Sequence, residues 1–184
     1  MKWKEVSNLV QDILIGIGAN LPSLRGAPPI EAARAAVIAL DGVPGLLLVG
    51  LTRWYESAPM PPSGQPAYIN GVAHLRGALD PADLLAVLQR IEDAAGRRRG
   101  EPNAARTLDL DIIAMGDQIR PAPDPVLPHP RAHLRAFVLL PLADVMPDWV
   151  HPIFGLGVRE LIAALPAQTI RALIRVSSIR YLFD

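Results

Sequence analysis

Residues 106–113 read Arg-Thr-Leu-Asp-Leu-Asp-Ile-Ile, and the apolar run continues to residue 115. Its length and β-branched content are typical of a buried strand, which we predict over residues 107–115. Successive side chains of a strand alternate between its two faces. Asp109 and Asp111 are therefore expected on one face, with their Cα atoms roughly 6 to 7 Å apart, and the apolar side chains between them on the other.

Outward from this strand, the pattern of apolar runs predicts most of the fold. Asp80 and Pro81 are typical of a helix start, and Gly96 is typical of a helix end. The order strand, helix, two strands, helix, strand is that of a ferredoxin-like α+β fold, an antiparallel sheet with helices packed on one face. Strands are predicted at residues 12–18, 46–55, 68–75 and 170–176, and helices at residues 30–40, 81–95, 137–145 and 158–165.

The composition fits one globular domain over residues 1–184, with 51% hydrophobic residues to fill a core. We expect the core at residues 12–150, an N-terminal extension at 1–11 and a C-terminal addition at 151–184. Lysine plus arginine equals aspartate plus glutamate at 18 each, and cysteine is absent. No stretch approaches the roughly 18 apolar residues of a membrane span. We therefore expect a cytoplasmic monomer without nucleic-acid or membrane partners.

The two aspartates are candidates for a metal site. An Asp-x-Asp pair on a strand is more often a solvated face, but here apolar residues continue on both faces beyond it. Two carboxylates at about 6 Å repel by roughly 2 to 3 kcal/mol at an effective dielectric constant of 20. A cation would remove that repulsion, and carboxylate oxygens without cysteine nearby suit Mg²⁺, which usually shares its coordination with substrate phosphates.

Arginines lie on either side of the loop that precedes this strand. Residues 97–99 are all arginine, and Arg106 comes directly before the acidic strand. The guanidinium group suits bidentate phosphate contacts, so the two motifs together indicate a polyphosphate site, although an arginine run can also be a solvated loop. A Walker loop is absent, and the dinucleotide fingerprint fails because its third glycine would fall at Leu21. Nucleotide binding would then depend on Mg²⁺ and side chains.

The chain resembles the hydroxymethyl-dihydropterin pyrophosphokinases. The resemblance runs from about residue 13 to residue 149 and depends on the joint order and spacing of eight motifs. These are Ile-Gly-Ala-Asn-Leu at 17–21, Tyr-Glu-Ser-Ala-Pro at 55–59, Gln-Pro-Ala-Tyr-Ile-Asn at 65–70, Gln-Arg-Ile-Glu at 89–92, Gly-Arg-Arg-Arg at 96–99, Arg-Thr-Leu-Asp-Leu-Asp-Ile at 106–112, Pro-His-Pro-Arg at 128–131 and Arg-Ala-Phe-Val-Leu-Leu-Pro-Leu at 135–142.

The resemblance implies an enzyme of folate biosynthesis that transfers pyrophosphate from ATP to the hydroxymethyl group of 6-hydroxymethyl-7,8-dihydropterin and releases AMP. It implies that Asp109 and Asp111 hold two Mg²⁺ ions and, with Arg97 and Arg106, form the catalytic set. The implied ATP contacts are Gln89, Glu92, Arg97, Arg99, Arg106, Ile112, His129 and Arg135. The implied pterin contacts are Ser57, Ala58, Met60, Tyr68, Asn70 and Phe137.

Two other functions compete with this interpretation. A nucleotidyltransferase or phosphoesterase could use the same Asp-x-Asp pair, and its nucleotide product would differ. An RNA-binding module on a ferredoxin-like sheet would need exposed aromatic residues on the central strands and a basic face. The strands carry acids instead, and the net charge is zero.

Overall fold

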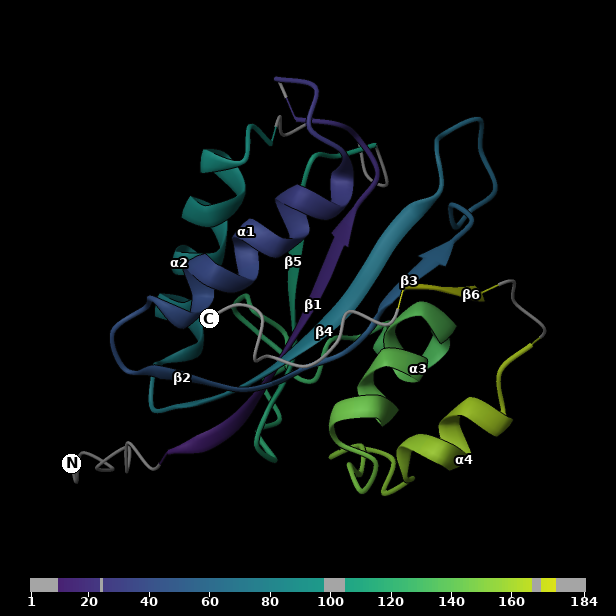
Figure 1. Cartoon of the computed structure of the whole chain (residues 1–184). Coiled ribbons are helices and arrows are strands. Elements are labelled where there is room, and N and C mark those ends of the chain that lie inside the picture. The colour runs from purple at the N-terminus through teal and green to yellow at the C-terminus, as the bar shows by residue number, and fades with distance from the viewer. Residues whose placement is uncertain (1–9, 24, 98–104, 167–169, 175–184) are drawn as a thin grey trace.

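A computed structural model describes residues 10–23, 25–97, 105–166 and 170–174 (Figure 1). Strand β1 lies in the middle of a sheet, between β5 and β4, and is antiparallel to both. The sheet continues from β4 to β3 and β6, and β2 also pairs with β4. The strands are β1 (Gln11–Ala19), β2 (Leu46–Leu51), β3 (Trp54–Ser57), β4 (Tyr68–Gly77), β5 (Asp109–Met115) and β6 (Ile170–Ile174).

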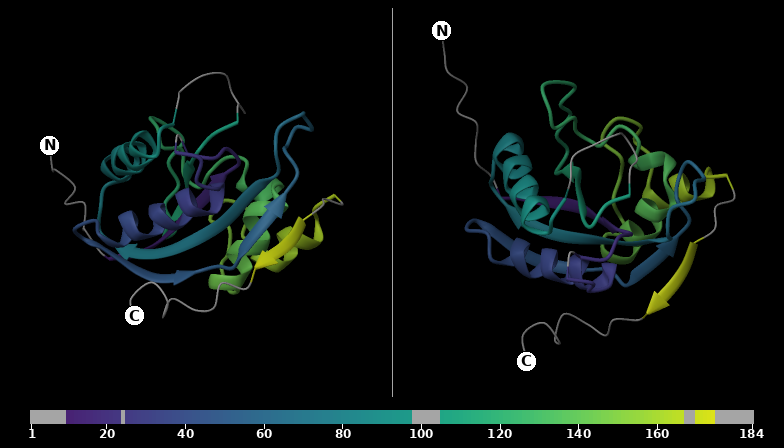
Figure 2. Two further views of the ribbon diagram at one scale, coloured as in Figure 1. Left: turned by 45° about the horizontal axis from the view of Figure 1, so that its top comes forward. Right: turned by 90° about the horizontal axis from the view of Figure 1, so that it is seen from above.

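Helices cover both faces of this sheet. Figures 1 and 2 show two of them, α3 and α4, side by side and apart from α1 and α2. Leu40 and Leu84 pack with Ile15 on one face, whereas Leu139 and Leu161 pack with Leu14 on the other. The helices are α1 (Pro29–Asp41), α2 (Pro81–Ala94), α3 (Ala136–Val145) and α4 (Val158–Ala163), with a short 3₁₀ turn, Ala132–Leu134, before α3.

The ferredoxin-like prediction is confirmed for the βαββαβ core, in which α1 and α2 share one face of the antiparallel sheet. The second helical layer, α3 and α4, was predicted as helices but not as a cover for the opposite face. It arises because β1 is buried on both sides, with Leu14 directed to one layer and Ile15 to the other. A strand in that position needs apolar cover on both faces.

The helix signals act where the sequence predicted them. The side chain of Asp80 accepts a hydrogen bond from the backbone N–H of Ala82 at 2.8 Å and so caps α2. The helix ends before Gly96, which has a φ of 80°, a conformation that glycine adopts without strain. These two signals place Arg97 just beyond the C-terminal end of α2, directly before the segment that leads to β5.

One element prediction was wrong. A single strand was expected at residues 46–55, but the structure has β2 and β3 separated by Thr52 and Arg53. The hydroxyl of Thr52 accepts a hydrogen bond from the backbone N–H of Val72 at 3.0 Å. The backbone N–H of Thr52 donates to the Val72 carbonyl at 3.1 Å. Because the side chain takes part in the ladder, regular pairing stops there.

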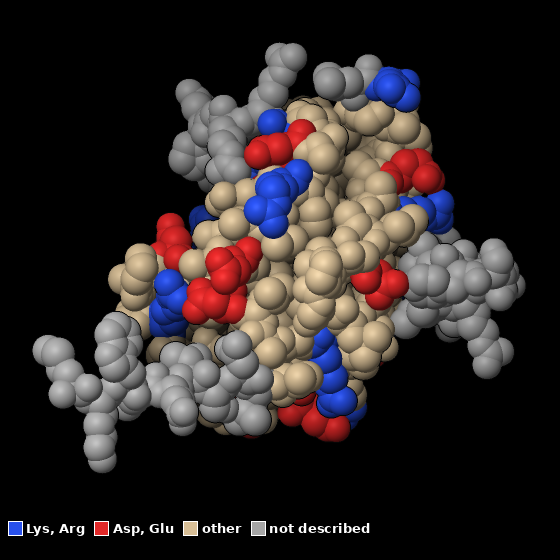
Figure 3. All heavy atoms as spheres, turned by 90° about the vertical axis from the view of Figure 1, so that its left-hand side faces the viewer, with Lys and Arg blue, Asp and Glu red and all other residues tan. Residues whose placement is uncertain are grey.

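Charged side chains of both signs lie at the surface of the molecule. On the face drawn in Figure 3, basic and acidic groups lie interspersed. Within the described residues, no helix combines the length and the apolar character needed to cross a membrane.

Candidate active site

The register of three neighbouring strands builds the floor of the site. Gly18 of β1 pairs with Asn70 of β4 on one side and with Asp109 of β5 on the other. Paired residues on adjacent antiparallel strands point to the same side of the sheet. A Cβ atom placed on Gly18 would lie 3.8 Å from Asn70 Oδ1 and 3.8 Å from Asp109 Cβ, so the glycine leaves open space between these two side chains.

The two acids of β5 lie on this face, and Leu110 between them packs into the α1 and α2 layer. The alternation ends at a bulge, because Ile15 pairs with Ile112 while Leu14 pairs with Ala114. Ile113 is the extra residue. The bulge places the side chains of Ile113 and Ala114 together in the α3 and α4 layer. The acids are thus confined to the half of β5 that faces open space.

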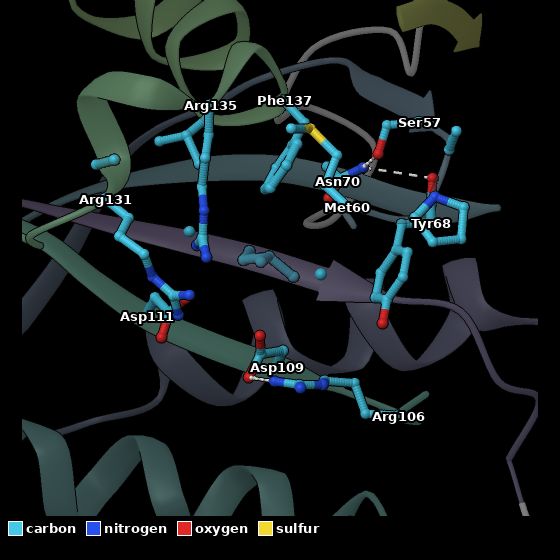
Figure 4. A pocket seen from close by; sticks show the side chains of 18 of the residues that line it. Ser57, Met60, Tyr68, Asn70, Arg106, Asp109, Asp111, Arg131, Arg135 and Phe137 are labelled. Carbon is cyan, nitrogen blue, oxygen red and sulfur yellow. Dashed lines mark hydrogen bonds and ion pairs between the residues drawn. The ribbon is translucent and has the colours of Figure 1, made fainter. Parts of the chain in front are cut away.

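A cavity of about 660 Å³ lies over this floor (Figure 4). Its walls come from the proline-rich loop, residues 58–66, from the segment before β5 and from the segment that leads into α3. All the residues predicted for the pterin line it, namely Ser57, Ala58, Met60, Tyr68, Asn70 and Phe137. It is also lined by six of the residues predicted for nucleotide or metal, namely Arg97, Arg106, Asp109, Asp111, His129 and Arg135.

One end of the cavity is neutral and carries a fixed amide. Asn70 donates from Nδ2 to Ser57 Oγ at 2.9 Å and to the Tyr68 carbonyl at 3.3 Å. Both amide hydrogens have partners, so Oδ1 is the atom that faces Gly18 and the cavity. Figure 4 shows Tyr68 and Phe137 extending into the same space from β4 and α3. This end suits a flat heterocycle whose edge donates hydrogen bonds.

The other end is charged. Asp109 accepts ion pairs from Arg97 Nη1 at 2.9 Å and from Arg106 Nη1 at 2.8 Å. Burial is the largest single effect and disfavours the guanidinium charge of Arg106, but Asp109, Tyr68 and Asp111 together outweigh it, so the pKa of Arg106 is raised. Asp111 keeps 44% of its side chain exposed to the opening. Desolvation by the cavity wall, and then the charge of Asp109, raise the pKa of Asp111.

His129 faces Asp111 in a defined orientation. The backbone N–H of Arg131 donates to His129 Nδ1 at 3.1 Å, and the backbone N–H of His129 donates to the Ile113 carbonyl at 2.8 Å. Because Nδ1 is an acceptor, the neutral ring carries its proton on Nε2, which lies 3.8 Å from Asp111 Oδ2. Burial is the largest cause of a lowered pKa for this imidazole. The ring therefore presents an N–H donor to the cavity.

Two arginines close the charged end. Figure 4 shows Arg131 and Arg135 extending into the cavity from the segment before α3. The guanidinium carbon of Arg135 lies 5.5 Å from the centroid of the Phe137 ring, a cation–π distance. Burial, and then the nearby charge of Arg131, lower the pKa of Arg135. A group that brings negative charge into the cavity would relieve this crowding of cations.

Three more of the predicted nucleotide residues are described, and they do not line the cavity. Gln89 is half-buried on α2, and Ile112 is buried in the layer formed with α1 and α2. Glu92 is 3% exposed and accepts a 2.7 Å hydrogen bond from the backbone N–H of Leu110 as well as an ion pair from Arg97. Arg99 lies outside the described residues. Nucleotide contacts by these four residues stay predictions.

Sequence reasoning assigned no role to several residues that the structure places at the cavity. Arg131 belongs to the Pro-His-Pro-Arg motif, whose basic character could have indicated it. Gln65 lies in the proline-rich loop and lines the cavity. Gly16 and Gly18 form the floor, and their spacing of two on a strand was the available signal.

The donor set fits a hard divalent cation. Two carboxylates face the opening and the sequence contains no cysteine. Within the described part of the chain, no group of three or more histidine, aspartate or glutamate side chains is arranged to hold a metal by itself. The other ligands would come from water and substrate oxygens, which is how Mg²⁺ is usually bound beside phosphates.

Comparison with known proteins identifies the family. Residues 14–147 match the family model described as 7,8-dihydro-6-hydroxymethylpterin-pyrophosphokinase. The 2-amino-4-hydroxy-6-hydroxymethyldihydropteridine pyrophosphokinase of Pseudomonas aeruginosa is 41% identical over 165 residues, which cover 90% of this chain and 98% of that protein. The protein of the same name from Synechocystis is 39% identical over 149 residues, covering 81% of this chain and 73% of the relative.

Solved structures agree on the fold. The HPPK-DHPS of Plasmodium falciparum superposes with a TM-score of 0.62 at 12% identity, covering 86% of this chain and 45% of that longer one. At this identity the likeness concerns the fold, and the chain spans less than half of the solved protein. The family assignment rests on the family model and the bacterial relatives. The chain belongs to the 7,8-dihydro-6-hydroxymethylpterin-pyrophosphokinase family.

Proposed function

We propose that this chain transfers the pyrophosphoryl group of ATP to the hydroxymethyl group of 6-hydroxymethyl-7,8-dihydropterin, in folate biosynthesis. The hydroxymethyl oxygen attacks the β-phosphorus and loses its proton to water, the bond from that phosphorus to the bridging oxygen of the α-phosphate breaks, and AMP leaves with that oxygen. The observation that carries the proposal is a single cavity with a neutral aromatic end and an acidic, arginine-rich end that meet at Gly18.

The neutral end accounts for the acceptor substrate. The pterin ring lies between Tyr68 and Phe137, and Asn70 Oδ1 accepts a hydrogen bond from its edge. The proline-rich loop, with Ala58 and Met60, forms the wall. Gly18 leaves the space through which the hydroxymethyl group reaches the phosphates.

The acidic end accounts for the metal. Asp109 and Asp111 would hold two Mg²⁺ ions together with phosphate oxygens and water, and these ions would neutralise charge on the β- and γ-phosphates. Asp111 is exposed to the opening and can accept such a ligand directly. Asp109 is shared by Arg97 and Arg106, and a cation bound to that carboxylate would weaken both ion pairs, so that the two guanidinium groups could also donate to phosphate oxygens.

The basic side chains account for the transferred group. The triphosphate is contacted by Arg97, Arg106 and Arg135. His129 donates a hydrogen bond to it from Nε2–H. These groups already line the cavity before ATP arrives, so little rearrangement is needed for them to stabilise the charge that develops on the equatorial oxygens. Catalysis is then mainly positioning and electrostatic stabilisation.

Within the same proposal the chain works as a cytoplasmic monomer without nucleic-acid or membrane partners, over one domain with its catalytic core at residues 12–150. The interspersed charge on the face drawn in Figure 3 supports the part that concerns nucleic acid. Light scattering after size exclusion tests the monomer directly.

Single substitutions of the two acids test the proposal. Asp109→Asn and Asp111→Asn should each lower turnover by on the order of 100-fold or more, while circular dichroism and melting stay close to wild type. Asp117→Asn is the matched control, because that carboxylate lies exposed on the turn after β5, outside the cavity. Full activity in either cavity variant would exclude the metal role. Release of inorganic pyrophosphate instead of AMP would indicate nucleotidyl transfer.

A further inference from the structure

Asn20 is a buried polar residue for which the proposed mechanism has no use. It follows β1 directly and is 1% exposed. Its Nδ2 donates to Gln65 Oε1 at 3.2 Å and to the Pro66 carbonyl at 3.2 Å. Its Oδ1 accepts from the backbone N–H of Arg106 at 2.9 Å, and its own backbone N–H donates to the Arg106 carbonyl at 3.1 Å.

These bonds join three segments that are far apart in the sequence. Gln65 and Pro66 end the proline-rich loop, which forms the wall of the neutral end. Gln65 Oε1 also accepts from the hydroxyl of Tyr68 at 3.1 Å. Arg106 is the partner of Asp109 at the charged end. One amide therefore connects the pterin wall to the arginine beside the metal ligands.

We infer that Asn20 is a positioning residue that holds the proline-rich loop and Arg106 at a fixed distance from each other. The neutral end and the charged end of the cavity are thereby kept in a fixed relative position. An amide is suited to this because it offers two donors to the loop and an acceptor to Arg106 at once. The inference rests on the proposed function and assigns a role that the catalytic set does not contain.

An Asn20→Asp substitution tests the connection to the loop separately from the connection to Arg106. In Asn20→Asp a carboxylate oxygen can still accept from the Arg106 N–H, whereas both donors to Gln65 and Pro66 are lost and an anionic oxygen faces their acceptors. The loop should therefore detach while Arg106 stays in place. Gln65→Met tests the same connection from the other side, because it keeps the length of the side chain but removes the acceptor.

The kinetic signature is a selective change in KM. We expect the KM for the pterin to rise about tenfold in Asn20→Asp, the effect of one hydrogen bond of ordinary strength, while the KM for ATP stays within about twofold. Gln65→Met should change the same constant in the same direction by less. Asp80→Ala is the control for destabilisation alone, because it removes the cap of α2, outside the cavity.

Hydrogen exchange provides a readout that does not need turnover. The backbone amides of the non-proline residues within 58–66 should exchange faster in Asn20→Asp than in wild type, and the same amides in Asp80→Ala should not. The inference would be overturned if the KM for the pterin in Asn20→Asp changed no more than in Asp80→Ala, or if hydrogen exchange in that loop were the same in Asn20→Asp and wild type. If the wild-type chain shows no pyrophosphoryl transfer, the proposed function fails, and the exchange measurement alone then decides whether Asn20 positions the loop.

Discussion

Asn70 and Asp109 face the same cavity from the two strands that flank β1, and Gly18 lies between them in the register of the sheet. Neighbouring strands lie about 4.8 Å apart, so the Cα atoms of these two residues are separated by roughly 10 Å. That span brings the fixed amide of the neutral end and the acid of the charged end within reach of one small acceptor molecule. The relationship depends on strand pairing, not on any loop.

The glycine in this row gives the first prediction. Gly18→Ala should lower turnover by at least about tenfold, because the added methyl group occupies the floor where the two substrates meet. Its Cβ would make ordinary contacts at 3.8 Å, and alanine suits a strand better than glycine, so stability should stay equal or rise by up to about 1 kcal/mol. Steady-state kinetics and thermal melting measure both effects.

Gly64→Ala is the matched control for that substitution. Gly64 lies in the proline-rich loop but does not line the cavity, its φ is not positive, and a Cβ there meets nothing within 4 Å. It should retain full activity. Equal activity in the Gly18 variant would show that the reacting groups do not meet over this position.

Ser57 gives the second prediction. In Ser57→Ala the amide of Asn70 loses the shorter of the two hydrogen bonds that fix its orientation, so it can rotate and offer the wrong group to the pterin edge. We expect the KM for the pterin to rise about tenfold while the KM for ATP is unchanged. Ser57→Thr keeps the hydroxyl and should restore most of the affinity. Equal pterin affinity in the alanine and wild-type proteins would mean that the amide orientation is held by other groups.

Glu92 gives the third prediction. Glu92→Ala should destabilise the fold by about 2 kcal/mol, because the buried N–H of Leu110 and the Arg97 guanidinium lose their acceptor. Glu92→Gln should recover most of that loss, since an amide oxygen still accepts from Leu110. Urea unfolding measures the difference. A tenfold rise in the KM for ATP in Glu92→Gln without loss of stability would instead support the nucleotide contact that the family resemblance implies.

A polar cluster at the opposite end of β1 gives a pH-dependent prediction. Asp12 accepts hydrogen bonds from Arg76 at 2.9 Å and from His74 at 2.8 Å, and these bonds, that of Arg76 most, lower the pKa of Asp12 below its ordinary value of 3.8. A depressed folded-state pKa means that the carboxylate stabilises the fold above pH 3.8. That contribution disappears as the pH falls through the lower folded value.

Asp12→Asn should therefore cost about 1 kcal/mol at pH 7, the scale of a partly exposed charged hydrogen bond. The difference from wild type should shrink as the pH falls below the ordinary aspartate value. Denaturant unfolding across that range measures it, with Asp117→Asn as the exposed control. A difference that stays constant with pH would contradict the charged interaction.

Much of the fold could be predicted because local signals and tertiary packing agree. The alternation of acids and leucines in β5 is a pattern that only a strand with two different faces satisfies. Asp80 and Gly96 have the side chain and the backbone freedom that the ends of α2 require. The common face of Asp109 and Asp111 could be predicted for the same reason, since their spacing alone places them on one side of the strand.

The rest depends on pairings that a sequence does not record. The row of Asn70, Gly18 and Asp109 exists because β1 lies between β4 and β5 in one particular register. Glu92 lies on α2 with Gln89, and both were predicted to contact ATP. The packing of α2 against β5 instead buries the Glu92 carboxylate, which accepts a hydrogen bond from the Leu110 N–H. The break between β2 and β3 arises because the Thr52 side chain accepts a hydrogen bond from the neighbouring strand β4.

The most direct test follows both products of one reaction by phosphorus NMR. The protein is mixed with ATP, Mg²⁺ and 6-hydroxymethyl-7,8-dihydropterin, and the phosphorus signals are assigned as the ATP is consumed. We predict a pterin diphosphate ester and AMP in equal amounts, and formation of both slower by on the order of 100-fold or more in the Asp111→Asn variant. ADP with a pterin monophosphate, or pyrophosphate with an adenylylated pterin, would contradict transfer of a pyrophosphoryl group across this cavity.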